Sequence, residues 1–200
     1  MLYIRRLRLL QESIFEKFCI SPIVKLIFVE FNFIRPWHLT LIGLWLGILS
    51  SIFIVIGSKT FSVILLIFSG GFDALDGAYA RLAKLTCDKG AVLDIISDRV
   101  VEFSVILALF LVDPAQRSYY VVLMLGATFL CVTSFLVVAV FTKGSGKKSF
   151  FYSRGLMERY EAFVFFICMI ILPQHFNVIA MLYSLLVAYT GFMRVFDFCR

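Results

Sequence analysis

Long apolar stretches alternate with short polar segments along most of this chain. A transmembrane helix needs about 20 apolar residues, and six stretches come close to that length. They predict membrane spans at residues 39–57, 61–84, 89–112, 119–141, 155–172 and 176–198. Charged residues interrupt the second and third stretches, so these two spans differ from the other four.

The composition excludes a soluble protein of this size. Hydrophobic residues make up 62% of the 200 residues and charged residues 16%, and the mean hydropathy is +0.98. A soluble domain of this length has too little interior to hide so much apolar surface. We therefore predict an all-α integral membrane fold with six transmembrane helices.

The N-terminal part of the chain follows a different pattern. Apolar residues recur at near-helical spacing from Ile4 to Phe18, with charged residues between them. A helix with one apolar and one charged face lies along the membrane surface rather than crossing the membrane. We predict an N-terminal interfacial amphipathic segment at residues 1–36, followed by the six-span domain at residues 37–200.

Basic residues gather at the N-terminus, in alternate connections and at the C-terminus, while the opposite side has only Lys59 and Arg117. Cytoplasmic loops are enriched in Lys and Arg, so both termini are expected in the cytoplasm, as is the 84–89 connection. The net charge of +6 then reflects topology and attraction to anionic lipid headgroups. These residues form no continuous basic stripe, which argues against nucleic-acid binding.

Four aspartates lie within or at the edge of apolar sequence, where carboxylates are costly. They are Asp73 and Asp76 in the second predicted span and Asp94 and Asp98 in the third. A charged carboxylate at the centre of a membrane helix costs about 2.5–3.5 kcal/mol on insertion scales. Four such residues so close together in the sequence indicate a functional site.

The spacing of these aspartates brings them together if the two spans form an antiparallel hairpin. Asp73 and Asp98 are equally distant from the polar turn at residues 84–89, and Asp76 and Asp94 nearly so. With a constant rise per residue, equal distance from the turn means equal depth. Asp73 and Asp76 are three residues apart, and Asp94 and Asp98 are four apart, so each pair shares one helix face.

A cluster of four carboxylates indicates bound metal. Oxygen ligands alone suit Mg²⁺ or Mn²⁺, and two such ions form a common clamp for in-line displacement at phosphorus. Gly77 and Ala80 would let a nucleotide diphosphate approach the helix backbone. Arg81 lies one turn nearer to water than Gly77 and is placed to contact a phosphate.

Two alternatives remain open at this stage. The carboxylates could form a proton or ion relay in an intramembrane transporter. They could also be paired with Arg81, Arg99 and Lys84 for packing alone. Neither alternative accounts for the small residues or for the matched depths.

The motif resembles that of the CDP-alcohol phosphotransferase family at every constrained position. The resemblance implies transfer of a substituted phosphate from a CDP-linked donor, usually CDP-diacylglycerol in bacteria, to an alcohol hydroxyl, with release of CMP. It also implies a homodimer in a bacterial inner membrane, with the active site facing the cytoplasm. The matching residues are Asp73, Asp76, Gly77, Ala80, Arg81, Gly90, Asp94 and Asp98.

The resemblance assigns a role to most of these positions. All four aspartates are implied as metal ligands, and Asp98 also as the general base that takes the proton of the acceptor hydroxyl. Residues implied to contact the CDP moiety are Gly77, Ala80 and Arg81. Thr40 is a further expected nucleotide contact. It ends the segment Arg35-Pro36-Trp37-His38-Leu39-Thr40, which resembles the family's sequence at the entry to the first span. An ordinary helix start also explains Thr40.

The acceptor is indicated by more distant residues. Residues 155–161 are similar to the corresponding segment of family members that use inositol phosphate. We therefore predict that the acceptor is a phosphorylated polyol such as inositol phosphate or glycerol 3-phosphate. Such an acceptor needs cationic partners, and the candidates include Lys143, Arg154 and Arg159. Charges that only set the membrane orientation are an alternative explanation for the basic residues of this loop.

Overall fold

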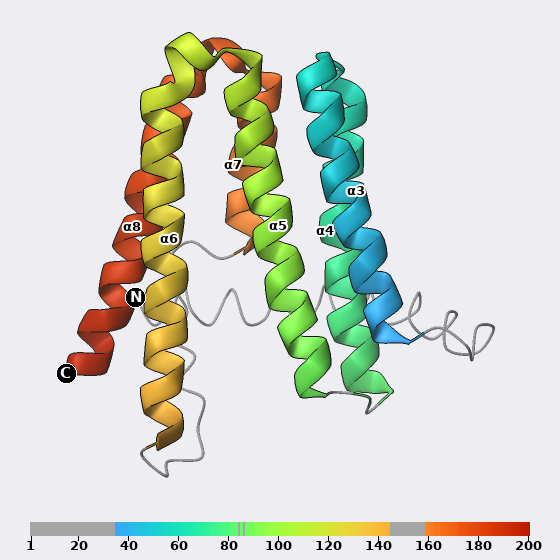
Figure 1. Ribbon diagram of the computed structural model, residues 1–200, viewed down its shortest axis with the longest axis vertical. Coiled ribbons are helices and arrows are strands. Elements are labelled where there is room, and N and C mark those ends of the chain that lie inside the picture. Colours follow the sequence, from blue (N-terminus) through green and yellow to red (C-terminus); the bar gives the residue numbers. More distant parts are fainter. Residues whose placement is uncertain (1–34, 84, 86, 145–158) are drawn as a thin grey trace, which may run out of the picture. The chain divides into compact units, whose positions relative to one another are not determined.

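The computed structural model describes residues 35–83, 85, 87–144 and 159–200 (Figure 1). The described residues form six α-helices and one short 3₁₀ helix, η2, at Pro173–His175, and they contain no strand. The predicted amphipathic helix of residues 1–36 lies almost entirely outside the described residues. The α-helices are α3 (Pro36–Ile56), α4 (Lys59–Leu82), α5 (Asp88–Val112), α6 (Pro114–Gly144), α7 (Arg159–Ile171) and α8 (Phe176–Cys199).

Each of the six predicted spans corresponds to one of these helices, so the predicted all-α membrane fold is confirmed. By length and composition, α3, α4, α6 and the segment Pro173–Cys199 are able to cross a membrane. Helix α5 is as long but contains several charged residues, and the apolar part of α7 within the described residues is shorter.

Among the described residues, the largest boundary difference from the expectation is at the start of the fourth span. Helix α6 begins at Pro114, before the predicted start of the fourth span at residue 119. The backbone N–H of Gln116 donates to Asp113 Oδ1 at 3.2 Å, which is the geometry of an N-terminal cap. Proline suits the first helical position because its missing N–H would have no partner there. Asp113 and Pro114 therefore start the helix ahead of its apolar stretch.

The described residues divide into two compact units. The first contains the described residues up to Ile48 together with Ile67–Val101, and the second contains Leu49–Leu66 together with the described residues from Glu102 onward. The four aspartates of the motif all belong to the first unit.

Helices α3 and α4 lie side by side in the first unit (Figure 1). The Ser69 hydroxyl donates to the Gly43 carbonyl at 2.7 Å. A Cβ atom on Gly43 would lie 3.2 Å from the Ser69 carbonyl oxygen, and one on Gly47 would lie 2.6 Å from both methyl groups of Val101. The G-x-x-x-G pair thus allows α4 and α5 to approach α3 closely, as such pairs do in membrane helices.

Replacing Gly47 with alanine is expected to destabilise the protein by about 1–3 kcal/mol, because the added methyl overpacks the contact with Val101. The free energy of unfolding in mixed micelles would measure this change. Adding Val101→Ala should recover part of the loss, since the two positions touch and their effects are not additive. Gly126→Ala is the matched control, because a Cβ there meets nothing within 4 Å. Equal effects of the two glycine substitutions would contradict the assigned contact.

A buried polar cluster joins three helices of the second unit. The Tyr183 hydroxyl of α8 donates to Glu102 Oε1 of α5 at 2.7 Å, and the Thr128 hydroxyl of α6 donates to the same oxygen at 3.3 Å. Glu102 is only 8% exposed and Tyr183 is fully buried. Hydrogen bonds of this kind make a carboxylate tolerable away from water.

Two arginines of the second unit contact backbone carbonyls and aromatic rings. Arg117 donates to the Leu109 carbonyl at 2.8 Å and lies over the Phe176 ring at 4.4 Å from its centroid. Arg194 of α8 donates to the Cys131 carbonyl of α6 at 3.0 Å. These contacts satisfy part of each guanidinium within an apolar helix bundle.

Candidate active site

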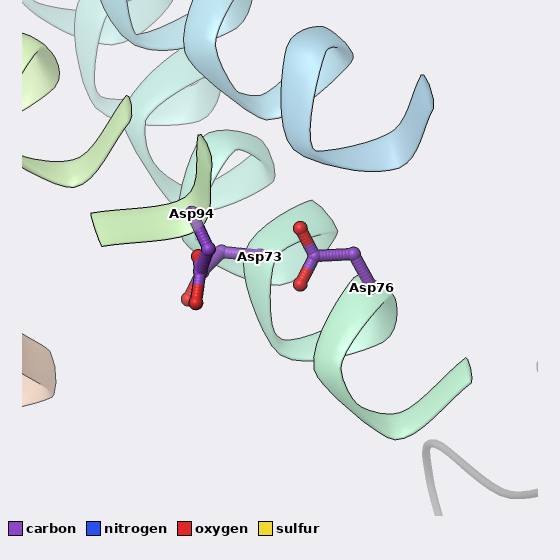
Figure 2. A group of neighbouring side chains, drawn as sticks. All are labelled: Asp73, Asp76 and Asp94. Atoms are coloured by element: carbon purple, nitrogen blue, oxygen red, sulfur yellow. The ribbon is translucent and has the colours of Figure 1, made fainter. Parts of the chain in front are cut away.

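Helices α4 and α5 bring three of the four motif aspartates together. Ligand oxygens of Asp73, Asp76 and Asp94, one from each residue, all lie within 4.8 Å of one another. Figure 2 shows the carboxylates of Asp73 and Asp94 side by side, with the Asp76 carboxylate turned toward them. The helical hairpin inferred from spacing therefore places carboxylates from both helices in one small volume.

Asp98 is one helical turn beyond Asp94 on α5 and is half-buried, and it does not belong to this group of three. The structure places ligand oxygens of Asp73 and Asp94 within 4.8 Å of each other, and the pairing of Asp73 with Asp98 inferred from rise per residue stays a prediction. Asp94 and Asp98 are one turn apart and share a helix face, so both can reach one facing carboxylate. The expected contact between Asp76 and Asp94 is present.

The surroundings of the three carboxylates favour a cation. Asp76 is only 4% exposed, while Asp73 and Asp94 are half-buried. At an effective dielectric constant of 20, like charges 4 Å apart repel by about 4 kcal/mol, so three ionised carboxylates at this separation are unfavourable by themselves. A divalent cation removes this repulsion, and an all-oxygen donor set fits Mg²⁺ or Mn²⁺.

A hydroxyl from the neighbouring helix contacts the most buried of these acids. Thr40 Oγ1 of α3 donates a hydrogen bond to Asp76 Oδ2. Thr40 is 6% exposed, and the adjacent Leu39 packs with Ala78 and Tyr79 in a small apolar cluster. Sequence reasoning had connected Thr40 with the nucleotide but had not paired it with Asp76. The two residues lie on different helices, and no local pattern links them.

The small residues and the arginine of the motif lie at the end of α4. Arg81 is exposed, and its Nη1 lies 3.3 Å from the position that a Cβ on Gly77 would occupy. Gly77 and Ala80 are half-buried. The missing side chain at Gly77 leaves room beside the helix backbone for the guanidinium. A guanidinium can bind a phosphate through paired hydrogen bonds, and contact of Arg81 with the donor stays a prediction.

A cysteine caps the other side of the turn. The Gly90 N–H donates to Cys87 Sγ at 3.4 Å, and Cys87 is exposed. Sulfur acts here as a weak substitute for the oxygen side chain of a usual helix cap. This contact helps to define where α5 begins, at Asp88.

The three predicted acceptor residues lie at or beyond the limits of the described structure. The backbone of Lys143 belongs to the last turn of α6, and that of Arg159 begins α7. Arg154 lies outside the described residues. Their contact with an acceptor stays a prediction.

A sequence model of the CDP-alcohol phosphatidyltransferase family matches residues 33–190. The chain belongs to the CDP-alcohol phosphatidyltransferase family. This family member is 31% identical over 171 residues to the inner membrane protein YnjF of Escherichia coli (strain K12), and the match covers 82% of each protein. Membership confirms the resemblance seen in the aspartate motif.

The fold of this family member is also similar to a solved structure. The crystal structure of Mycobacterium tuberculosis phosphatidylinositol phosphate synthase (PgsA1) with CDP-DAG bound superposes with a TM-score of 0.67 at 21% sequence identity. The superposition covers 90% of this chain and 93% of that one. The likeness identifies a shared membrane fold.

Proposed function

We propose that this family member transfers the phosphatidyl group of CDP-diacylglycerol to the hydroxyl of a small polar alcohol and releases CMP. The observation that carries the proposal is the group of three carboxylates within 4.8 Å, built by the family's aspartate motif inside the matched range 33–190. The similarly folded phosphatidylinositol phosphate synthase has CDP-DAG bound, which supports this choice of donor.

The aspartates would hold the metal on which the reaction depends. Asp73, Asp76 and Asp94, with Asp98 nearby, would bind Mg²⁺ or Mn²⁺, and four carboxylates suit two ions. When bound, these cations would neutralise the donor diphosphate and the leaving CMP. The buried position of Asp76 keeps this carboxylate away from competing water.

The chain's own side chains would perform the remaining steps. Asp98 would accept the proton of the acceptor hydroxyl as that oxygen attacks the β-phosphorus of the donor. The bond from this phosphorus to the CMP oxygen would then break. Arg81 would contact a phosphate of the CDP group, and Gly77 and Ala80 would let that group lie against α4.

The acceptor is proposed to be a phosphorylated polyol such as inositol phosphate or glycerol 3-phosphate. Lys143, Arg154 and Arg159 would bind its phosphate group. We further propose a homodimer in a bacterial inner membrane, with both termini and the active site on the cytoplasmic side. Residues 1–36 would lie on the membrane surface, and residues 37–200 would form the six-span catalytic domain.

The proposal is tested with purified protein in detergent, supplied with CDP-diacylglycerol, Mg²⁺ and one labelled acceptor at a time. The acceptors are glycerol 3-phosphate, inositol phosphate, inositol and serine, and the readouts are CMP release and the labelled lipid product. We expect CMP release that requires both an acceptor and the metal. Ion flux in liposomes without CMP release for any acceptor would favour the transporter alternative.

Replacing Gly77 with alanine is expected to weaken use of the donor without unfolding the protein. Alanine is a better helix former than glycine by about 1 kcal/mol, and the added Cβ would meet only the flexible end of Arg81. The methyl group would, however, occupy the space where the nucleotide approaches α4. Steady-state kinetics should therefore give a higher KM for CDP-diacylglycerol with an unchanged or higher thermal midpoint.

Gly71→Ala is the matched control for this substitution. Gly71 lies on the same helix, and a Cβ there meets nothing within 4 Å, so its KM should stay at the wild-type value. A wild-type KM in the Gly77→Ala variant would contradict the proposed approach of the nucleotide at Gly77.

A further inference from the structure

We propose that Thr40 is a positioning residue for the metal-binding carboxylate of Asp76, an inference that rests on the proposed function. Thr40 Oγ1, on the second turn of α3, donates a hydrogen bond to Asp76 Oδ2 on α4. The two residues are 36 positions apart in the sequence. The bond therefore connects the start of α3 to the acidic face of α4, where Asp76 meets Asp73 and Asp94.

The direction of this hydrogen bond follows from the possible acceptors. A threonine hydroxyl has one proton to donate. The backbone carbonyl of Pro36, one turn earlier on α3, is a second acceptor at 3.4 Å. A bond to an ionised carboxylate is shorter and about twice as strong as one between neutral groups. The proton of Thr40 therefore belongs to Asp76, and Pro36 is a weak secondary contact.

The surroundings make this bond effective in holding the carboxylate. Thr40 is 6% exposed and Asp76 is 4% exposed. The neighbouring residues Leu39 and Tyr79 are each 3% exposed and form one apolar cluster with Ala78. Water cannot readily replace a lost partner in such a setting, and hydrogen bonds are electrostatically stronger there than in water. The hydroxyl thus limits the rotation of the Asp76 carboxylate.

This restraint matters because a carboxylate can serve a hydroxyl and a cation at the same time. Its two oxygens offer about four acceptor sites, so the bond from Thr40 leaves capacity for a metal shared with Asp73 and Asp94. Groups that hydrogen-bond a metal ligand orient it, and their loss typically costs about 10–100-fold in metal affinity or activity. Thr40 would act through Asp76, without touching the reacting atoms.

Binding of Mn²⁺ alone tests this role without any lipid substrate. Electron paramagnetic resonance titration of the purified protein would compare wild type with Thr40→Val and Thr40→Ser. Valine keeps the shape of threonine but cannot donate, so Mn²⁺ binding should weaken about 10-fold or more. Serine keeps the hydroxyl, and its affinity should stay close to that of wild type.

Kinetics supply a second measurement that separates this role from a nucleotide contact. In Thr40→Val, the Mg²⁺ concentration for half-maximal CMP release should rise in parallel with the loss of Mn²⁺ affinity. The KM for CDP-diacylglycerol at saturating Mg²⁺ should stay unchanged. A raised KM together with wild-type Mn²⁺ affinity would overturn the proposal and favour a direct contact of Thr40 with the nucleotide.

Ser69→Ala is the matched structural control. It removes another buried hydroxyl between α3 and α4, the one that donates to Gly43, and should leave Mn²⁺ affinity unchanged even if the thermal midpoint falls. Equal loss of Mn²⁺ affinity in Ser69→Ala and Thr40→Val would overturn the proposal, because disturbed packing of α3 against α4 would then explain the loss. If Thr40→Val does not fold, Thr40→Ala replaces it in the same titration. Wild-type Mn²⁺ affinity in Thr40→Ala would also overturn the proposal.

Failure of the proposed function would look different from failure of this inference. Wild-type protein that binds Mn²⁺ but releases no CMP would overturn the enzyme proposal and leave the test of Thr40 in place. Wild-type protein that releases CMP, with a Thr40→Val variant of unchanged Mn²⁺ affinity, would overturn only the positioning role.

Discussion

Replacing Asp98 with asparagine is expected to lower kcat for CMP release by about 10²–10⁴-fold, which is the usual contribution of a general base. Asparagine keeps the shape of the side chain but cannot accept a proton from the acceptor hydroxyl. Asp98 lies one turn from Asp94 on α5 and outside the group of three carboxylates. Its loss should therefore leave donor binding and the cation held by the other three carboxylates largely intact.

The measurement is steady-state CMP release, combined with Mn²⁺ titration and donor binding on the same preparation. Low turnover with retained Mn²⁺ and donor binding is the expected combination. Asp88→Asn is the matched control, because Asp88 is an exposed acid in the first turn of the same helix, and it should turn over like wild type. Survival of activity in Asp98→Asn would show that another group takes the proton.

Replacing Asp94 with asparagine is expected to weaken Mn²⁺ binding more than 100-fold, beyond the usual effect of changing a group that only supports a metal ligand. Asp94 is the one residue of α5 in the group of three carboxylates. Without its charge, this group of three would hold the cation through Asp73 and Asp76 of α4 alone. CMP release should fall to background at Mg²⁺ concentrations that saturate the wild type.

Stability should change in the opposite direction in the metal-free protein. Removing one of three neighbouring negative charges relieves their repulsion, so the thermal midpoint of Asp94→Asn without metal should equal or exceed that of wild type. Mg²⁺ should raise the midpoint of wild type by mass action and leave that of the variant unchanged. A wild-type response to Mg²⁺ in Asp94→Asn would contradict its role as a ligand.

The sequence predicted the helices well because a membrane leaves the backbone few choices. Backbone groups in lipid must find partners within the chain, so long apolar stretches become helices. The sequence predicted the ends of helices less accurately where polar residues determine them. The Asp113–Pro114 cap starts α6 before its apolar stretch begins.

The motif was recognisable from sequence because helical periodicity is local. Spacings of three and four residues place Asp73 with Asp76, and Asp94 with Asp98, on single helix faces, and one short turn brings the two helices together. The family match over residues 33–190 agrees with that interpretation. Candidate acceptor residues lie on more distant segments, so no comparable local pattern joins them to the site.

The sequence by itself determined the membrane class, the helices and the carboxylate faces, because apolar length and helical period depend only on neighbouring residues. Only the tertiary structure decided which side chains of different helices meet. It paired Thr40 of α3 with Asp76 of α4, and Glu102 of α5 with Tyr183 of α8. The physical reason is that such pairs depend on how packed helices are rotated and how closely they approach each other. Small residues such as Gly47 permit the close approach, but no single segment of the sequence determines it.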